Sequence, residues 1–426
     1  MQFLLFVLFL TLVAFGVPIA ISLAVSGISF IYIYHLGIDI LSPNFYSGIA
    51  KFPLLAIPFF VLAGVIMDRA GMAEKMVLFM KKLAGFVTGG LAIVTVLVGM
   101  FWAAISGSGP ADTAALSTIL IPGMKKAGYR ADFAAALVAA SGSLGIVIPP
   151  SIALIIYGTI TNTSVPALFA GGIIPGIIVG FSLMMAAYLI SKKEGYRKEE
   201  FPTLKEVLVS FKEAFWALLA PVIILGGIYG GIFTPTEAAS VAVFYGLFVG
   251  IFIYRTIDFK TLYHLMVDAA VNASVIMIIV TFAGIFSWTG STLGLMDKIT
   301  NFILSVGKEP ILAIFMINIL LLLAGMFLDA ISIYFIFLPI LLPVLDKFHW
   351  SYLWFGVIMT INLAIGQITP PVGVNLFVAA NIAKVKFEDI SKAAIPFIVA
   401  AFSALILLMY TPFLTTYLPK VWGLIK

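Results

Sequence analysis

The sequence predicts an all-α polytopic membrane protein, and three observations carry this prediction. Of the 426 residues, 62% are hydrophobic and only 10% are charged, whereas soluble proteins average roughly 45–50% apolar and about 25% charged residues. The apolar residues form long continuous runs, unlike the alternating segments of about ten residues that build a β-barrel. Motifs of the first half of the chain also return in the second half, as in many secondary transporters.

Composition excludes several kinds of site. The chain has no Cys, so it has neither disulfides nor thiolate metal sites. His35, His264 and His349 are too far apart to share a metal-ligand spacing, and the sequence has no P-loop that would bind ATP. The net charge of 24 − 19 = +5 is typical of cytoplasmic loops in a membrane protein. We therefore expect a lipid bilayer around the chain and no nucleic-acid partner.

An internal repeat divides the chain almost in half. Four matches occur in order, each displaced by about 220 residues: Gly99–Ser106 with Gly325–Ser332, Pro149–Pro150 with Pro370–Pro371, Pro175 with Pro396, and Val17–Pro18 with Thr234–Pro235. The longest polar interval separates the two halves. The predicted division is therefore a first repeat over residues 1–190, a basic cytoplasmic linker over 191–213, and a second repeat over 214–426.

The first repeat opens with apolar runs. Residues 2–34 are one kinked span or two short ones, and residues 46–68 are a further span. Charged and apolar residues interleave over 73–83, which fits an amphipathic helix in the membrane interface or the end of a span. The first run has no basic segment before it, so we expect no cleavable signal peptide.

Two interrupted segments follow in the first repeat. Residues 86–124 are too long for one span and contain the turn Ser106–Pro110, which predicts a helical hairpin. Residues 131–163 predict a helix that is broken near Ser141–Pro150. Residues 167–190 then complete the repeat as a single span.

The second repeat has matching segments. After spans near 214–254 and 265–290, residues 311–345 predict a second hairpin that turns at Phe327–Ser332. Residues 351–381 predict a second broken helix, interrupted at Gly366–Gly373. Residues 393–412 form the last span.

Basic residues orient the two hairpins. Both flanks of the first hairpin are basic and should be cytoplasmic; they contain Arg69, Lys75, Lys81 and Lys82 before it and Lys125, Lys126 and Arg130 after it. The second hairpin has sparser basic flanks that acidic residues partly balance, so it should enter from the outer face. Residues 158–166 carry no charge and should also lie outside. The sequence therefore predicts inverted repeats.

The four helix breaks are the candidate site. Non-helical backbone at membrane depth is tolerated only where protein buries it or where it lines a cavity. Freed carbonyls and hydroxyls suit a small hard cation such as Na⁺, while the N-termini of half-helices favour an anion. The alternative is that Gly and Pro only kink tightly packed helices.

Three acidic residues in apolar surroundings have different predicted roles. Asp112 either caps a helix or serves an ion path, and the sequence leaves both open. For Asp329, in the second hairpin turn, we favour an ion-linked role. Glu237 lies in Thr234-Pro-Thr-Glu237, a pattern that predicts a capping box.

The chain resembles the large, DctM-like membrane subunit of tripartite ATP-independent periplasmic (TRAP) transporters. The motifs that carry the resemblance span the whole chain: Ser106–Thr113, Ile121–Tyr129, Ile148–Ser151, Phe233–Ala239, Gly325–Asp329 and Thr369–Gly373. The resemblance implies an elevator-type transporter with a scaffold and a mobile transport domain, and no enzymatic activity. It also implies Na⁺-coupled import of an organic acid, either a sialic acid or a C4-dicarboxylate, across a bacterial or archaeal inner membrane. The implied partners are a small four-helix membrane subunit and a periplasmic substrate-binding protein.

The resemblance also implies two Na⁺ sites and a substrate site. The first Na⁺ site would use the hydroxyls of Ser106 and Ser108 with backbone oxygens of Gly145, Val147 and Pro150, with Asp112 behind them. The second would involve Gly325, Asp329, Gly366 and Thr369. The substrate carboxylate would dock near Ser106, Asp112 and Thr369.

Three alternatives remain open at this point. A stand-alone Na⁺-coupled organic-anion symporter would share the broad architecture. A channel would also use broken helices, and an intramembrane enzyme would need Asp112 and Asp329 as its catalytic pair.

An elevator movement predicts a change in accessibility. We expect Leu144 and Ile368, beside the two proline pairs, to change the side of the membrane from which they are accessible during turnover.

Overall fold

The computed structural model describes residues 3–196 and 199–425, and within them it contains helices and no strand. The α-helices, in chain order, are α1 (Leu4–Ala14), α2 (Ile19–Ile33), α3 (Leu41–Ile49), α4 (Ala56–Arg69), α5 (Met72–Ala84), α6 (Gly90–Ser106), α7 (Gly109–Lys126), α8 (Ala131–Ser143), α9 (Ile152–Thr161), α10 (Val165–Glu194), α11 (Leu204–Tyr229), α12 (Pro235–Phe248), α13 (Phe259–Thr292), α14 (Leu295–Val306), α15 (Pro310–Gly325), α16 (Ala330–Lys347), α17 (Tyr352–Gly366), α18 (Val374–Ala383), α19 (Phe387–Tyr410) and α20 (Phe413–Val421). Short helical segments of other types are η1 (Ile38–Ile40), η2 (Phe52–Leu55), η3 (Leu144–Ile146) and the π-helical η4 (Val249–Ile253).

Seven helical segments are long and apolar enough to cross a membrane: Phe52–Arg69, Val165–Glu194, Leu204–Tyr229, Pro235–Ile253, Phe259–Thr292, Ala330–Lys347 and Phe387–Tyr410. The shorter apolar helices include most arms of the predicted hairpins and broken helices. The prediction of an all-α polytopic membrane protein with hairpins and broken helices is confirmed. The N-terminal run, which the sequence left open, forms the two short helices α1 and α2.

Both predicted hairpins are present. Helices α6 and α7 form the first, and their turn passes through Gly107, whose φ of 69° is a conformation that glycine adopts without strain. Pro110 then lies in the first turn of α7, where its missing N–H leaves no helical bond unmade. Helices α15 and α16 form the second hairpin, which turns between Gly325 and Ala330.

Both broken helices are also present, and they form the centre of the protein. Helix α8 ends at Ser143 and α9 starts at Ile152, while α17 ends at Gly366 and α18 starts at Val374. Every residue from Phe133 to Ser143 is buried, as is every residue from Leu353 to Gly366. Helices that are buried on all sides in this way can face neither lipid nor water.

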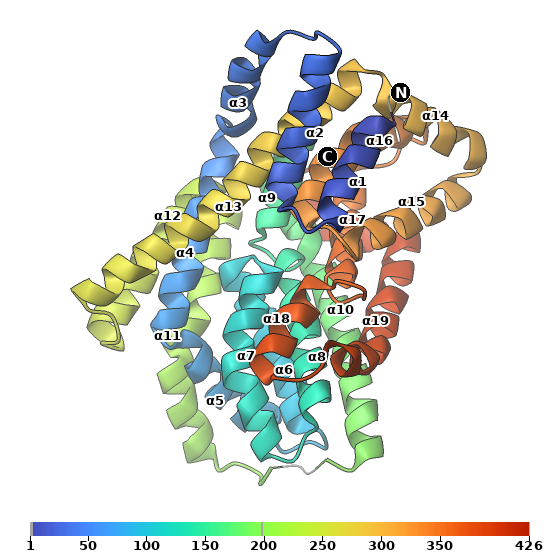
Figure 1. Cartoon of the computed structure of the whole chain (residues 1–426). Coiled ribbons are helices and arrows are strands. Elements are labelled where there is room, and N and C mark those ends of the chain that lie inside the picture. The colour runs from blue at the N-terminus through green and yellow to red at the C-terminus, as the bar shows by residue number, and fades with distance from the viewer. Residues whose placement is uncertain (1–2, 197–198, 426) are drawn as a thin grey trace.

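The helices fall into two groups that pack mainly within themselves. The peripheral group consists of α2, α4, α11, α12 and α13, and the central group consists of α6–α10 and α15–α19. Figure 1 shows the long α13 running diagonally beside α4 and α12, while α6, α7 and α8 lie together in the lower half of the view. This division matches the expected scaffold and transport domain.

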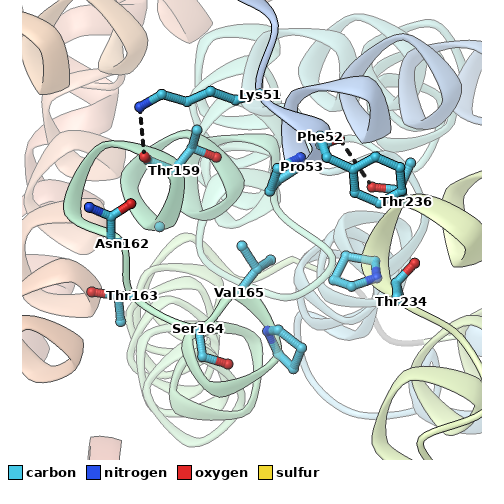
Figure 2. Close-up of a pocket in the computed structure, with 13 residues that line it drawn as sticks. Lys51, Phe52, Pro53, Thr159, Asn162, Thr163, Ser164, Val165, Thr234 and Thr236 are labelled. Atoms are coloured by element: carbon cyan, nitrogen blue, oxygen red, sulfur yellow. Dashed lines mark hydrogen bonds between the residues drawn. The ribbon is translucent and has the colours of Figure 1, made fainter.

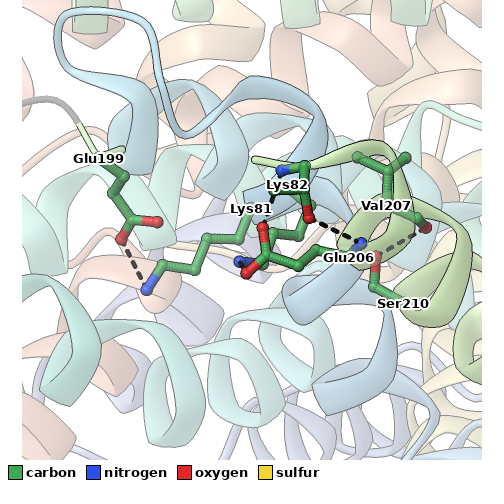
Figure 3. Close-up of polar contacts among 7 residues, drawn as sticks. Lys81, Lys82, Glu199, Glu206, Val207 and Ser210 are labelled. Atoms are coloured by element: carbon green, nitrogen blue, oxygen red, sulfur yellow. Dashed lines mark hydrogen bonds and ion pairs between the residues drawn. The ribbon is translucent and has the colours of Figure 1, made fainter. Parts of the chain in front are cut away.

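Ion pairs gather at one end of the molecule, where α10 leads into α11. Lys75 pairs with Glu213 at 3.1 Å, Lys81 with Glu199 at 2.6 Å, and Lys82 with Glu206 at 3.4 Å; Figure 3 shows the last two pairs. Arg130, on the other flank of the first hairpin, lies 3.7 Å from Glu194. Both flanks of this hairpin therefore lie at the same end as the linker, as the basic residues indicated.

Helix α5 resolves one of the alternatives left by the sequence. It is a separate amphipathic helix that packs on α11 and α6 and buries one face, which consists of Met72, Ala73, Met76, Phe79 and Met80. Its lysines make the exposed ion pairs described above. Such exposed pairs contribute only about 0–1 kcal/mol each, so the apolar face is the main attachment of α5.

The linker is shorter than residues 191–213. Helix α10 continues to Glu194, and α11 already begins at Leu204. The reason is local: Thr203 and Glu206 form a capping box, in which each side chain accepts the other's backbone N–H. The basic composition of this stretch marks the exposed surfaces of two helix ends.

Candidate functional site

Asp112 is a fully buried carboxylate beside the turn of the first hairpin. Its Oδ1 accepts a hydrogen bond from Ser106 Oγ, and Ser106 Oγ accepts one from the Ser108 N–H at 3.3 Å. No side chain caps the start of α7, so Asp112 does not have the capping role that the sequence left open. Its second oxygen, Oδ2, is buried and has no hydrogen-bond partner within the described residues. A buried carboxylate oxygen without a partner is costly, so this position favours a cation or a proton.

Gly145, in the break of the first broken helix, faces this free oxygen. A methyl group on Gly145 would come within 2.2 Å of Asp112 Oδ2 and 3.0 Å of the Ser108 carbonyl carbon. A methyl group on Gly107 would similarly come within 2.6 Å of the Pro150 carbonyl oxygen. The structure therefore brings Gly145 and Pro150 against the hairpin turn.

Val147 lies in the same break but faces elsewhere. The close contact of its carbonyl oxygen is with α10, where a methyl group on Gly172 would approach it to 2.7 Å. Among the expected ligands of the first Na⁺ site, the contacts therefore group Ser106, Ser108, Gly145 and Pro150 and direct the Val147 carbonyl towards α10.

The backbone of the second hairpin lies directly against the second break. A methyl group on Gly366 would come within 2.8 Å of the Gly325 Cα and carbonyl carbon. The Thr369 N–H donates to the Gly366 carbonyl at 3.0 Å, and Thr369 Oγ1 donates to the Ile365 carbonyl at 2.7 Å. These contacts bring the Gly325 and Gly366 backbones together and place Thr369 next to Gly366, with its hydroxyl bonded within its own helix end.

Both carboxylate oxygens of Asp329 accept hydrogen bonds from groups in the first turn of α16. It caps α16: its Oδ2 accepts from the N–H groups of Ile331 and Ser332, at 2.9 and 3.1 Å. Its Oδ1 accepts from Ser332 Oγ at 2.5 Å. These bonds account for the carboxylate without an ion, so the capping geometry expected as one option for Asp112 occurs at Asp329. Asp112 and Asp329 also have separate partners, which gives the catalytic pair of an intramembrane enzyme no support.

The cap at Asp329 leads to a stability prediction. Asp329→Ala should lower the free energy of unfolding by about 1 kcal/mol, because it leaves two helix N–H groups without an acceptor. Asp329→Asn keeps an acceptor oxygen and should lose much less, since Asn and Asp are similar caps. Thermal unfolding of the purified variants in detergent measures both changes. Equal losses in the two variants would contradict the cap.

The sequence analysis missed two buried amides, Gln367 and Asn375. Gln367 Oε1 and Asn375 Oδ1 have no hydrogen-bond partner in the described parts of the chain, and Asn375 Nδ2 donates to the Ala139 carbonyl at 3.3 Å. A methyl group on Gly109 would come within 2.3 Å of Gln367 Oε1. These contacts join the first hairpin and α8 to the second broken helix. The sequence feature that could have indicated them is the presence of an amide side chain in a mostly apolar break, at Gln367, and of a second one just after it, at Asn375.

The oxygens assembled here suit a hard cation. No group of three or more His, Asp or Glu side chains in the described ranges is arranged to hold a metal ion. The first cluster instead offers hydroxyl, carbonyl and carboxylate oxygens, which hard cations prefer. The free Asp112 Oδ2 and the close approach of the Gly145 backbone to it are the two features that fit a bound Na⁺.

Comparison with known proteins places these features in a family. The family model described as "Tripartite ATP-independent periplasmic transporter, DctM component" matches residues 6–414. The chain is 42% identical to the isethionate TRAP transporter permease protein DctMQ of Oleidesulfovibrio alaskensis. The aligned 409 residues cover 96% of this chain and 64% of that protein. It is 38% identical to the C4-dicarboxylate TRAP transporter large permease protein DctM of Vibrio cholerae, over 98% of this chain and 97% of that protein. It is 36% identical to the sialic acid TRAP transporter large permease protein SiaM of the same species, over 96% of both.

A solved structure shares the fold. The crystal structure of the Alcanivorax borkumensis YdaH transporter is similar over 87% of each chain, with a TM-score of 0.62 and 13% identity. At this identity the likeness concerns the fold alone.

Proposed function

Because the chain belongs to the DctM family of tripartite ATP-independent periplasmic transporters, we propose that it imports an organic acid together with Na⁺ by an elevator-type movement. In this proposal the central group of helices carries both ions and the substrate, and the peripheral group stays fixed in the inner membrane of a bacterium or archaeon. The main support is the buried Asp112 carboxylate with its unpartnered Oδ2 beside Gly145. A Na⁺ ion at this position would satisfy the oxygen and join the first hairpin to the first break.

The organic-acid class of the substrate rests on two arguments. The relatives are named for isethionate, C4-dicarboxylate and sialic acid, and each of these substrates carries an acidic group. Moving an anion through the low-dielectric interior needs compensating positive charge, which two Na⁺ ions would supply. Ser106 and Thr369 would then redirect their hydroxyl hydrogens from Asp112 and the Ile365 carbonyl to the substrate acid near these ions, with Asp112 behind the first of them.

The partners are part of the same proposal. A small four-helix membrane subunit would support the peripheral group, and a periplasmic binding protein would deliver the substrate to the outer face. The stand-alone Na⁺-coupled symporter is the second candidate, because the central group already contains the complete set of hairpins and breaks. A channel would lack coupling between the gradient and the substrate.

Reconstituted uptake tests coupling and partners together. We expect proteoliposomes that contain this chain and its small subunit to accumulate labelled succinate, isethionate or sialic acid only with a Na⁺ gradient and the cognate binding protein. Replacing Na⁺ by K⁺ should reduce uptake to the background of empty liposomes. Na⁺-independent uptake would overturn the coupling, accumulation by this chain alone would favour the stand-alone symporter, and single-channel currents would favour a channel.

A further inference from the structure

A cavity of about 670 Å³ opens between the two helix groups at the end of the molecule opposite the ion pairs. It is lined by the segment before α4, the connection between α9 and α10, and the start of α12, which contribute residues 51–53, 158–166 (except 160 and 161) and 234–236 (Figure 2). Helices α4 and α10 both run from this cavity to the end with the ion pairs, at Arg69 and Glu194. The cavity therefore faces the outer side of the membrane.

Lys51 is the one charged residue among the described residues that line the cavity. Its ammonium donates one hydrogen bond, to the Thr159 carbonyl at 3.2 Å, and none of the described carboxylates lies within 4.0 Å of it. A lysine ammonium has three N–H donors, so two remain for a ligand. Lys51 is also the only Lys or Arg in the first 68 positions. A basic residue on the outer side runs against the usual charge bias of membrane proteins.

The rest of the described lining is uncharged and mixes apolar with polar residues. The cavity wall carries hydroxyl and amide side chains, those of Thr159, Asn162, Thr163, Ser164, Thr234 and Thr236. The nearby Glu237 is not among the lining residues, and its carboxylate accepts hydrogen bonds from the Thr234 N–H and hydroxyl, each at 2.8 Å. A wall that holds one ammonium and several hydroxyls, with no acid among its described residues, suits a carboxylate or sulfonate that also carries a hydroxyl group.

We propose that this cavity is an outer collecting site for organic anions, in which the Lys51 ammonium binds the acidic group. The anion would replace the Thr159 carbonyl as the partner of Lys51 before it reaches the hairpin turns. Lys51 lies before α4 of the peripheral group and Thr159 lies in α9 of the central group, so binding would also loosen a contact between the groups. The identity of the anion rests on the proposed function, whereas the anion preference of the cavity does not.

Charged thiol reagents test this proposal without transport. Because the chain has no native Cys, Thr163→Cys gives a single thiol in the cavity wall. In the purified full chain in nanodiscs, the rate of the negatively charged sulfonatoethyl methanethiosulfonate relative to that of the positively charged trimethylammonioethyl reagent should exceed the same ratio for a small thiol in solution. Adding Lys51→Met should lower this ratio at least about two-fold, because it removes a charge that attracts one reagent and repels the other. Lys51→Arg should restore the ratio.

Protection of the Thr163→Cys thiol by organic acids is the second part of the test. Millimolar isethionate or succinate should slow the sulfonate reagent when Lys51 is present and should have no effect in Lys51→Met. The matched control is Lys308→Met, which removes an exposed lysine before α15 and should change neither result. A rate ratio that ignores Lys51, or an absence of protection by any organic acid, would overturn the collecting site. If protection occurs while Na⁺-driven uptake fails, the site stands and the proposed function is wrong.

Discussion

Gly145→Ala should abolish Na⁺ binding at the first site and, with it, Na⁺-driven uptake. The new methyl group would lie 2.2 Å from Asp112 Oδ2, where it occupies the space that the proposed ion needs. Na⁺ bound to the native protein should raise its free energy of unfolding by about 2.7 kcal/mol when its concentration is about 100 times the dissociation constant. In Gly145→Ala this increase should vanish. Thermal unfolding in NaCl and in KCl at equal ionic strength measures the difference.

Gly123→Ala is the matched control for this substitution. Gly123 lies within α7, and a methyl group on it would meet nothing within 4 Å. Because Ala is favoured over Gly in helices by about 1 kcal/mol, this variant should be at least as stable as the native protein and should keep its response to Na⁺. A folded Gly145→Ala protein with a native response to Na⁺ would remove the first site from the proposal.

The sequence predicted the helix breaks well because glycine and proline act locally. The turn at Gly107 needs a positive φ, and the helices on either side of each proline pair end close to the expected positions. The buried cores of α8 and α17 followed from continuous apolar sequence. These features depend on a few neighbouring residues, so a pattern of residue types is enough to locate them.

The roles of the acidic residues could not be read in the same way. Asp112 and Asp329 both lie near a hairpin turn, yet only Asp329 is close enough to its helix start to bond two N–H groups. Asp112 instead accepts a hydrogen bond from Ser106 across the turn. Its unpartnered oxygen faces Gly145, which lies in the break of the first broken helix. A difference of this kind depends on tertiary contacts. The approach of Gln367 to Gly109 escaped the sequence for the same reason.

The probe positions that the sequence suggests for the elevator movement are poorly accessible. The sequence predicts that Leu144 and Ile368 change the side from which they are accessible, but their side chains are 0% and 1% exposed in this structure. Both lie at the end of a helix that is buried on all sides, so the helical spacing of apolar residues does not indicate which positions are exposed. Exposed positions near the two breaks are Ala111, in α7 beside the first hairpin turn, and Val372, in the second break, which is 40% exposed.

The central group has the internal bonds that a rigid moving body needs. Asn362 Nδ2 donates to the carbonyl and side-chain oxygens of Asn318 at 2.8 and 2.9 Å, which ties the second broken helix to its hairpin. Asn375 then ties the same broken helix to α8. These buried bonds link both repeats, so the two hairpins should travel together. The peripheral group touches the first hairpin where Gly64 leaves room for Ser106, whose Cβ would lie 3.3 Å from a methyl group on Gly64.

Single cysteines at Ala111 and Val372 should therefore change sides together during turnover. We expect a membrane-impermeant maleimide to label both from one face of oriented proteoliposomes in Na⁺ without substrate. Under an inward Na⁺ gradient with substrate and binding protein, both should become labelled from the opposite face. Phe259→Cys, at a position 93% exposed at the start of α13, serves as the fixed control and should be labelled from one face throughout. If Ala111→Cys and Val372→Cys keep one face under every condition, or if only one of them changes, the central group does not move as a single body and the elevator proposal is wrong.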